Sequence, residues 1–398
     1  MKETKNTPQL RFSEFDVEWE EKKLNNYLEV STEKNFDNLF TKENVLSVSG
    51  EFGVVNQIAF QGRSFAGASL TNYKISDLES VIYTKSPLNA TPYGIIKANK
   101  FEKGIVSVLY AVYKTNNSDS KFIQDYFNLD ERLNNYLRPL ISKGAKNTIN
   151  VSDLEALEGI VTFPSLSEQQ KIGTFLSHVD SLIQAKTKKL ESLKAIKKSL
   201  LQKCFPKAGE KVPEMRFAGF IGDWEEKKFG DVVTRVTESS DTPQLPRVEY
   251  EDILSEGQLR EDFFTKSSSK RGIHFRKNHI LFGKLRAYLR NNILATFEGI
   301  AVGDFWVLET KQLDSKFLFI MIGSNSFQEV ANISAGSKMP RSDWSLVSDY
   351  NLFLPPTLAE QQKIGQFFSR YDSLISLQQK EIDKLKTIKK SLLQKMFV

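Results

Sequence analysis

The amino-acid sequence predicts an α+β protein formed by tandem duplication, in which a globular mixed α/β domain is followed by a long helix and this arrangement occurs twice. We expect the two helices to pack as an intramolecular antiparallel coiled coil. Two observations predict this fold class. A helical segment of 40 residues returns almost unchanged later in the chain, and the segments that precede its two copies have similar lengths but little sequence in common.

The duplication is visible in two gapless alignments of the chain with itself. Residues 166–205 match residues 358–397 at 25 of 40 positions. Residues 11–23 (RFSEFDVEWEEKK) return as residues 216–228 (RFAGFIGDWEEKK). Agreement of this extent does not arise by chance, so the chain contains a duplication. The two matching segments of each copy stayed alike, while the residues between them diverged.

The repeats divide the chain into four parts. Pro164 and the pair Pro355-Pro356 stop the preceding segments just before each 40-residue repeat. The predicted parts are a first globular domain at 1–163, a first helix at 164–205, a second globular domain at 206–355 and a second helix at 356–398.

Each repeat is expected to form one long helix, because it contains no Pro, a single Gly and many Leu, Lys, Gln and Glu residues. Apolar residues alternate at spacings of four and three, which is typical of a helix that packs along another helix. These positions are Ile172, Leu176, Val179, Ile183, Leu190, Leu193 and Leu200 in the first copy, and Ile364, Phe368, Tyr371, Ile375, Ile382, Leu385 and Leu392 in the second. The pattern is interrupted at Lys186 and Lys197 in the first copy and at Gln378 and Lys389 in the second. The alternative is two unrelated surface helices, each packed on its own domain.

The segments before the helices are expected to be globular. Short β-branched or aromatic runs bounded by Gly, Pro or polar residues predict strands at residues 80–83, 104–110 and 305–308. Residues 121–137 and 315–322 have helical character. Each segment is therefore expected to be a mixed α/β domain.

Composition excludes several classes of protein. The 40% of hydrophobic residues and 29 Phe are enough for buried cores, so global disorder is excluded. The single cysteine, Cys204, allows no internal disulfide and indicates a reducing compartment, so a cytoplasmic location is expected. Residues 1–12 have no apolar stretch, and no window is long and apolar enough for a membrane span, so no membrane association is expected.

The distribution of charge points to an anionic partner. The net charge is +6, but the two helical repeats carry +5 and +4, so the remaining residues sum to −3. A lysine-rich helix face is commonly a solvated surface, and contact with phosphates or a protein partner is the alternative. The helices alone therefore do not locate a DNA site.

The second globular domain contains a basic stretch with interleaved aromatic and amide residues. Residues 260–290 hold nine Lys or Arg against two acidic residues. Basic groups suit phosphates, and forked or amide side chains suit base edges, so this stretch predicts nucleic-acid contact. The DNA-binding candidates in this domain are Lys266, Lys270, Arg271, Lys284, Arg286, Tyr288, Arg290, Lys338 and Arg341.

The first globular domain has a sparser counterpart. Ile82-Tyr83-Thr84-Lys85 mirrors Leu281-Phe282-Gly283-Lys284 as an apolar pair, one residue and a Lys at the expected end of a strand. Both segments predict a strand end that presents a polar loop. The DNA-binding candidates in this domain are Arg63, Lys74, Tyr83, Lys85, Asn89 and Tyr93.

Residues that support catalysis are scarce. The three histidines are His178, His274 and His279, of which His178 is replaced by Arg370 in the other repeat, while the other two form a poor pair for metal binding. The sequence lacks the GxxxxGK[ST], GxSxG and HExxH patterns. We therefore expect a chain that is not an enzyme and binds no metal or cofactor of its own.

The residues described so far resemble one family. The two segments PSLSEQQKI (164–172) and PTLAEQQKI (356–364), each on a helix that ends in KKSLLQK, are similar to the specificity subunits of type I restriction-modification systems. The paired Trp19-Glu20 and Trp224-Glu225 and the Lys-Leu-Arg-Ala-Tyr segment at 284–288 add to this resemblance. The first domain has Lys-Ser-Pro-Leu at 85–88 instead, so an arginine role is not transferred to it.

The resemblance implies a non-catalytic subunit for defence against foreign DNA. Each globular domain would be a target-recognition domain that reads one half of an asymmetric bipartite sequence in double-stranded DNA. The helices would space the domains and dock two modification (methyltransferase) subunits, while two restriction subunits would supply ATP-dependent translocation and cleavage. S-adenosylmethionine, ATP and Mg²⁺ are expected on those partners.

Two identical polar triplets at the helix starts are candidates for partner docking: Glu168, Gln169 and Gln170, and Glu360, Gln361 and Gln362. The alternative is a role at the N-terminus of each helix, where an acidic side chain is favourable. For the whole chain, the alternatives are a two-headed structural adaptor that joins two protein partners, and a standalone DNA-processing enzyme of unfamiliar type.

Overall fold

The computed structural model describes residues 6–143, 149–207, 209–254, 257–260, 263–265, 269–333 and 339–398. The chain forms two compact units that are not contiguous in sequence. Unit 1 comprises Met1–Lys186 and Glu381–Val398, and unit 2 comprises Thr187–Lys380. Both long helices, α4 (Leu166–Lys203) and α9 (Leu358–Lys395), contribute residues to both units.

The centre of unit 1 is a four-stranded antiparallel sheet in the order β2-β9-β6-β7. Its strands are β2 (Leu28–Val30), β9 (Ala111–Thr115), β6 (Val81–Tyr83) and β7 (Ile96–Ala98). Both faces of the sheet are buried: Val81 and Tyr83 face the core that contains α2 (Ser120–Tyr126) and α3 (Asp130–Leu137), whereas Ile82 packs on Leu46 and Val106. This burial explains the uninterrupted apolar run of β6.

The second face of this sheet is covered by short two-stranded elements. These are β3 (Leu46–Ser49) paired with β4 (Gly53–Asn56), and β5 (Lys74–Ser76) paired with β8 (Gly104–Val106), with the short helix α1 (Gln57–Gln61) directly after β4. Two further pairs are β1 (Glu20–Lys23) with β12 (Ile160–Phe163), and β10 (Ser142–Lys143) with β11 (Ile149–Asn150).

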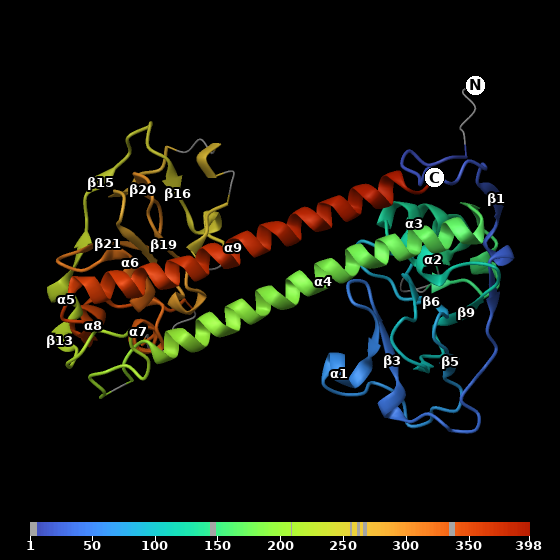
Figure 1. Ribbon diagram of the computed structural model, residues 1–398, viewed down its shortest axis with the longest axis horizontal. Helices are drawn as coiled ribbons and strands as arrows, with labels where there is room; N and C mark the ends of the chain where they lie inside the picture. The colour runs from blue at the N-terminus through green and yellow to red at the C-terminus, as the bar shows by residue number, and fades with distance from the viewer. Residues whose placement is uncertain are drawn as a thin grey trace. The chain divides into compact units, whose positions relative to one another are not determined.

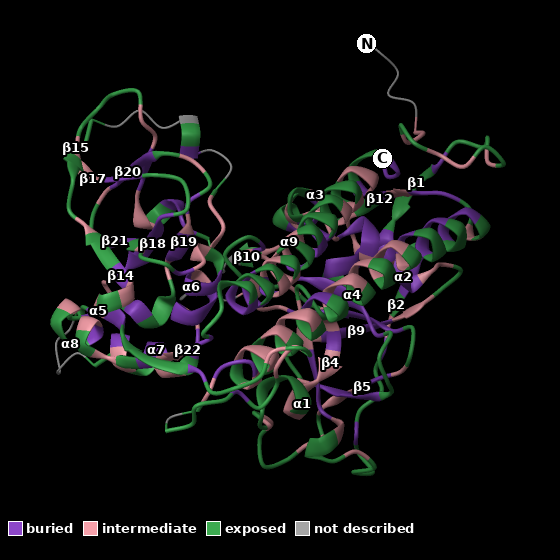
Figure 2. Cartoon of the chain, turned by 60° about the vertical axis from the view of Figure 1, so that its left-hand side comes forward, coloured by how far each residue is buried: buried purple, intermediate pink, exposed green. Residues whose placement is uncertain are grey.

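Unit 2 repeats the central sheet with the same strand order, β14-β21-β18-β19. Its strands are β14 (Val233–Val236), β21 (Phe305–Thr310), β18 (Ile280–Gly283) and β19 (Asn292–Leu294). Ile280 and Phe282 face one core and Leu281 faces the other, as in β6. The centres of both sheets are buried in Figure 2.

The rest of unit 2 surrounds this sheet. A second sheet, β15-β17-β20-β16, contains β15 (Ser239–Ser240), β17 (Gly272–Phe275), β20 (Gly299–Ala301) and β16 (Arg247–Val248), and β13 (Glu225–Lys228) pairs with β22 (Asn351–Leu354). The helices are α5 (Phe229–Val232), α6 (Ser315–Ile322), α7 (Asn325–Ala331) and α8 (Trp344–Asp349). The described 3₁₀ turns of the chain are η1 (Leu24–Asn26), η2 (Lys42–Asn44), η3 (Arg138–Leu140), η5 (Glu155–Leu157), η6 (Tyr250–Asp252), η8 (Phe263–Thr265) and η9 (Ala287–Leu289).

The helices α4 and α9 pack side by side in opposite directions (Figure 1). In unit 1, Asp180 of α4 pairs with Lys389 of α9, and Lys186 pairs with Glu381 at 2.6 Å. In unit 2, Lys197 of α4 pairs with Asp372 of α9. Residue numbers therefore rise along α4 as they fall along its partner, and all the predicted apolar positions between the helices are buried or half-buried. The predicted antiparallel coiled coil is confirmed.

Each long helix begins on one globular segment and ends in the core of the other. The end of α9 places Phe397 in the unit 1 core, with ring centroids 6.5 Å from Trp19 and 5.2 Å from Phe122. The end of α4 places Phe205 in the unit 2 core, 6.1 Å from Trp224. The alternative of two independent helices, each packed on its own domain, is therefore wrong. Among the described residues, no helix has the length and apolar character needed to span a membrane.

Candidate nucleic-acid interface

The two strand-end loops predicted from the sequence occupy equivalent places in the two units. In unit 1, residues 84–95 connect β6 to β7, and in unit 2 residues 284–291 connect β18 to β19. Both strands lie third in sheets of the same order. The structure therefore supports the equivalence that the apolar-pair and Lys pattern predicted.

The loop of unit 2 exposes a cluster of basic and aromatic side chains. The single turn η9 lies between Arg286 and Arg290, and both arginines have left-handed backbone conformations with φ of 52° and 55°. Arg286, Arg290 and Tyr288 are exposed, with Tyr288 58% accessible. Of the residues that the structure describes, no carboxylate forms an ion pair with either arginine. These side chains can reach an anionic ligand.

The base of this loop is held by partly buried hydrogen bonds. The Tyr250 hydroxyl donates to the carbonyl of Asp304 at 2.6 Å and accepts from the backbone N–H of Leu285 at 3.1 Å. Burial raises the pKa of Tyr250 to about 12, so this hydroxyl keeps its proton at neutral pH. The Arg286 N–H donates to the carbonyl of Pro340 at 2.8 Å, and the Ser342 N–H donates to the carbonyl of Lys284 at 2.9 Å.

Asp304 pairs with two of the predicted DNA-binding cations. Its carboxylate lies 3.0 Å from Nη2 of Arg341 and 3.5 Å from Nζ of Lys284. The hydrogen bond from Arg341 is the largest cause that lowers the pKa of Asp304. One carboxylate compensates only one of these two positive charges, and the Arg341 side chain is 51% exposed. Arg286 and Arg290 are exposed cations of the loop without an ion pair in the described part of the chain.

Much of the remaining basic stretch is neutralised by acids that lie far away in the sequence. Lys270 pairs with Glu249 at 2.8 Å, and Arg276 pairs with Glu238 at 3.1 Å. Arg271 is exposed, and its Nε donates to Oγ of Ser239 at 2.8 Å. Of the remaining predicted contacts, Lys266 and Lys338 lie outside the described residues. The positive charge counted along residues 260–290 therefore overstates the free charge at this surface.

In unit 1, three of the predicted DNA contacts have roles inside the unit. Tyr83 is completely buried, and its hydroxyl donates to the carbonyl of Tyr93 at 2.7 Å, so the prediction that Tyr83 contacts DNA is wrong. Lys85 binds Asp153 at 2.6 Å and the carbonyl of Val151 at 2.7 Å, and Lys74 binds the same carboxylate. The side chains of Lys74 and Lys85 are 14% and 16% exposed, which favours a structural role over DNA contact.

Electrostatics agree with this assignment. Burial raises the pKa of Asp153, but hydrogen bonds from Lys74 and Lys85 outweigh burial and hold the pKa below its ordinary value. The remaining unit 1 candidates are Arg63 and Asn89, which are exposed, and Tyr93, which is half-buried. The Arg63 guanidinium lies 4.6 Å from the ring centroid of Phe65. DNA contact by these three residues stays a prediction.

The polar triplets predicted to dock partners are mostly buried within their own units. Glu168 accepts hydrogen bonds from Nε and Nη2 of Arg11 at 2.7 and 2.8 Å, and from Nε1 of Trp19 at 3.3 Å. The Gln169 side chain accepts from the backbone N–H of Asp119 and donates to the carbonyl of Pro164.

Unit 2 repeats this arrangement except that its glutamine donates to a carbonyl one position earlier in the chain. Glu360 accepts from Arg216 and Trp224, while Gln361 bonds with Asp314 and Pro355. Docking by the four buried residues of the triplets is therefore not supported, because their polar atoms are used inside the units. Gln170 and Gln362 are exposed, and docking by them stays a prediction.

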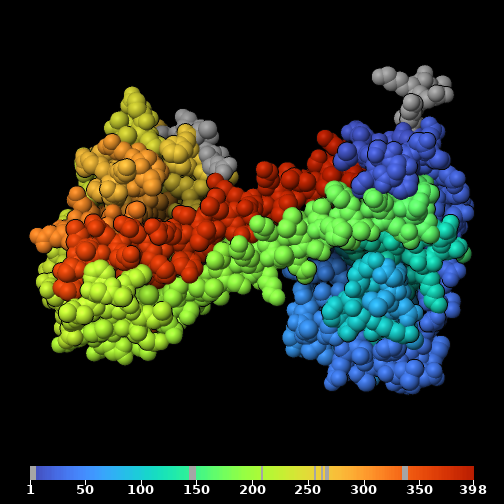
Figure 3. All heavy atoms as spheres, in the orientation of Figure 1, coloured from blue at the N-terminus to red at the C-terminus, as the bar shows by residue number. Residues whose placement is uncertain are grey.

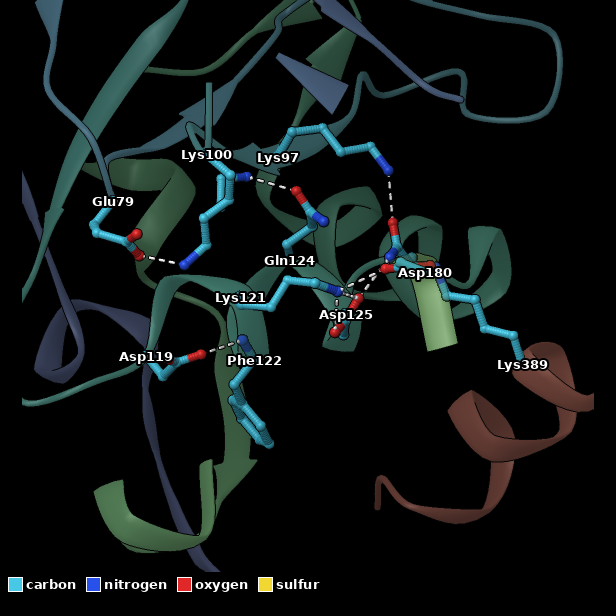
Figure 4. A network of polar contacts seen from close by, with 12 residues as sticks. Glu79, Lys97, Lys100, Asp119, Lys121, Phe122, Gln124, Asp125, Asp180 and Lys389 are labelled. Atoms are coloured by element: carbon cyan, nitrogen blue, oxygen red, sulfur yellow. Dashed lines mark hydrogen bonds and ion pairs between the residues drawn. The ribbon is translucent and has the colours of Figure 1, made fainter. Parts of the chain in front are cut away.

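A buried polar network in unit 1 was not predicted from the sequence (Figure 4). Lys121 contacts Asp125 at 2.5 Å and Asp180 of α4 at 3.0 Å, and Asp180 also binds Lys389 of α9. Lys97 of β7 donates to Oδ1 of Asn128 at 2.6 Å, and burial lowers its pKa to about 8. The network joins the sheet, α2 and both long helices. Lys121 and Asp125 are four residues apart on α2, a spacing that the sequence shows, but their contacts with Asp180 and Lys389 come from segments far apart in the chain.

Comparisons with known proteins agree on one kind of protein. Residues 221–387 match the family model described as the type I restriction modification DNA specificity domain. The type I restriction enzyme MjaIX specificity subunit of Methanocaldococcus jannaschii is 25% identical over 329 residues, which cover 74% of this chain and 68% of that protein. The MjaVIII specificity subunit of the same organism is 25% identical over 269 residues, covering 61% of this chain and 62% of the relative.

Solved structures show the same fold at low sequence identity. A type I restriction-modification S subunit from M. genitalium superposes with a TM-score of 0.62 and 14% identity, covering 98% of this chain and 99% of that one. A chain from a study of complex assembly and conformational transition of the type I R-M system has a TM-score of 0.54 and 14% identity, covering 95% and 97%.

Proposed function

Because residues 221–387 match the specificity-domain family model and the curated relatives are specificity subunits, we propose that this chain is the non-catalytic DNA-recognition subunit of a type I restriction-modification complex. Each unit binds one half of an asymmetric bipartite sequence in double-stranded DNA. One observation carries this proposal. The two units share the central sheet and the contacts around Glu168 and Glu360, but differ in the loops at the ends of β6 and β18.

The difference between the loops is chemical. In unit 2, the loop exposes Arg286, Tyr288 and Arg290. In unit 1, Lys85 is held by Asp153, and residues 86–93 include neither Lys nor Arg. Two equivalent loops with different side chains present different charged, donor and acceptor groups to DNA, whose sequence is read from base edges and from the shape of the duplex. The two halves of the recognised sequence are therefore expected to differ.

The long helices supply the surface for protein partners. Large apolar side chains remain exposed at equivalent positions of the two helices, Leu182 and Ile196 on α4 and Leu374 and Ile388 on α9. In Figure 3, α4 (green) and α9 (red) form part of the visible surface. Two copies of the same exposed pattern suit two copies of one partner, which we assign as modification subunits. Two restriction subunits complete the complex, and the partners carry S-adenosylmethionine, ATP and Mg²⁺.

A map of methylated adenines tests the proposal. The chain is expressed with its modification subunit in a bacterial host that has no adenine methylation, and the genome is mapped for modified bases. We expect a gapped, asymmetric motif that disappears when this chain is omitted. The same motif in cells without the chain contradicts the proposal. If the complex assembles but neither binds nor methylates DNA, the chain is a structural adaptor instead.

A further inference from the structure

The backbone of the unit 2 loop is strained at two positions. Arg286 and Arg290 both adopt the left-handed region, which is unfavourable for a residue other than Gly. Such conformations persist only where the surroundings determine them, and functional sites are among the places where they cluster. Here both strained residues are exposed arginines on either side of one turn, η9.

The surroundings of the loop fix its conformation from below. Ala287, between the two arginines, is buried and anchors η9 to the unit 2 core. The Asn292 side chain accepts from the backbone N–H of Gly283 at 3.2 Å, which joins the two ends of the loop. Tyr250 and the segment containing Pro340 and Ser342 hold its first half through the hydrogen bonds described above.

The cations of this region fall into two groups. Lys284 and Arg341 share the carboxylate of Asp304, so their combined charge is partly compensated and both are held at one point. Arg286 and Arg290 have no ion pair within the described part of the chain and face solvent. Unit 1 has only the first group at its equivalent loop, because Lys85 and Lys74 share Asp153 and no further cation follows.

We propose that Arg286 and Arg290 bind phosphates of the DNA backbone at the half of the sequence that unit 2 recognises, and that Asp304 is a positioning residue. Asp304 acts through Arg341 and Lys284, which hold the loop in the strained form that presents both arginines. Unit 1 has no equivalent pair, so the phosphate contacts made through the strand-end loops are concentrated on one half of the sequence. This proposal rests on the function proposed above.

Binding of DNA at several salt concentrations tests the proposal. The full chain, in complex with its modification subunit, is titrated with a duplex that carries the mapped motif and with a duplex of the same composition in scrambled order. The variants are Arg286→Gln, Arg290→Gln and Asp304→Asn. Lys277→Gln is the matched control, because Lys277 is an exposed cation of the same unit outside the loop. Chemical unfolding of each variant verifies that it folds.

Loss of one phosphate contact has a defined signature. For Arg286→Gln and Arg290→Gln we expect binding to both duplexes to weaken roughly fivefold to tenfold, and the slope of log K against log salt to fall by about 0.9. Lys277→Gln should leave affinity and slope unchanged. Asp304→Asn should weaken binding to the motif with an unchanged slope, because it removes no phosphate contact, and Asp304→Glu should restore binding.

Three results overturn the proposal. Wild-type affinity and slope in both arginine variants exclude phosphate contact. A change confined to one base position of the motif, with the slope unchanged, means that the arginines read bases instead. An equal loss in Lys277→Gln means that only general charge matters. If the wild-type complex shows no preference for the motif duplex, the proposed function itself fails, which separates the two failures.

Discussion

Glu168 and Glu360 occupy equivalent buried positions, where each binds an arginine and a tryptophan from the segment that leads into the first strand of its unit. The side chains of these glutamates are 2% and 1% exposed. Their conservation between the two copies follows from this internal role. Identical residues in the two copies of a repeat therefore make the same contact twice. Here that contact lies inside each unit and not with a partner protein.

Replacing Glu168 by Gln should destabilise unit 1. The substitution keeps the shape but leaves the Arg11 charge without its partner, and breaking a buried pair costs on the order of 3 kcal/mol. Chemical unfolding measures the change in the free energy of unfolding. Glu20→Gln is the control, because its pair with Lys22 is exposed, and it should leave stability nearly unchanged. Equal effects of the two substitutions would contradict the internal role of Glu168.

The residue equivalent to Lys97 in unit 2 is apolar, so the sheet does not require a charged residue at this position. Lys97 pairs with Ile82 across the sheet, as Ile293 pairs with Leu281. Burial lowers the pKa of Lys97 to about 8, below the value of about 10.4 expected in the unfolded chain. Below pH 8 the Lys97 amine is charged in both the folded and the unfolded chain, and burial of this charge lowers the free energy of unfolding. This destabilisation disappears as the pH rises to about 10.4.

The variant Lys97→Met should therefore be more stable than the wild type by about 1 to 2 kcal/mol at pH 7. The difference should shrink between pH 8 and pH 10, because the wild type gains stability over this range. Chemical unfolding at several pH values measures both effects. A variant that is less stable at pH 7, with no dependence of the difference on pH, would show that the charged amine stabilises the network in Figure 4.

At the scale of elements, the close approach of each long helix to its own globular segment depends on glycine. A Cβ at Gly173 of α4 would lie 2.7 Å from Oδ1 of Asp119, which caps α2 by accepting from the N–H of Phe122. A Cβ at Gly365 of α9 would lie 2.9 Å from Oδ1 of Asp314, which caps α6. The single Gly of each repeat is thus explained by one contact made twice.

Gly173→Ala should destabilise unit 1 although Ala favours helices by about 1 kcal/mol. The added methyl group must displace the backbone or the cap, which costs about 1 to 3 kcal/mol in a packed region. Thermal unfolding measures the shift. Thr174→Ala, at an exposed position of the same helix, should be neutral or slightly stabilising. A stabilised Gly173→Ala protein would show that α4 and α2 can separate without cost.

The elements also show what the sequence can and cannot predict. The spacing of Ile172 and Leu176 predicted the helix pair because periodicity is local. The placement of Phe397 in the unit 1 core was not predicted, because a local sequence pattern does not show which distant residues a side chain will contact. The loop at 284–291 was predicted because its pattern lies within one short segment. The ion pair between Lys284 and Asp304 was not predicted, because the two residues lie far apart in the sequence.

At the scale of the whole molecule, the continuous helix α4 leaves unit 1 at Lys186 and enters unit 2 at Thr187 without interruption. Removing one heptad from α4 and the facing heptad from α9 shortens the pair by about 10 Å while keeping its apolar register. We expect the gap between the half-sequences to shorten by about 3 base pairs, at 3.4 Å each, with both halves unchanged. A constant gap in a variant that folds and binds would exclude the helices as spacers.

Each unit is expected to read its own half of the recognised DNA sequence. A domain exchange tests this division directly: residues 229–357 are replaced with the corresponding segment of another specificity subunit, and methylated adenines are mapped in a host without adenine methylation. We expect a new motif in which one half changes while the other half keeps its bases. A motif that changes in both halves, or in neither, from a complex that assembles and methylates would show that the units do not read the halves separately.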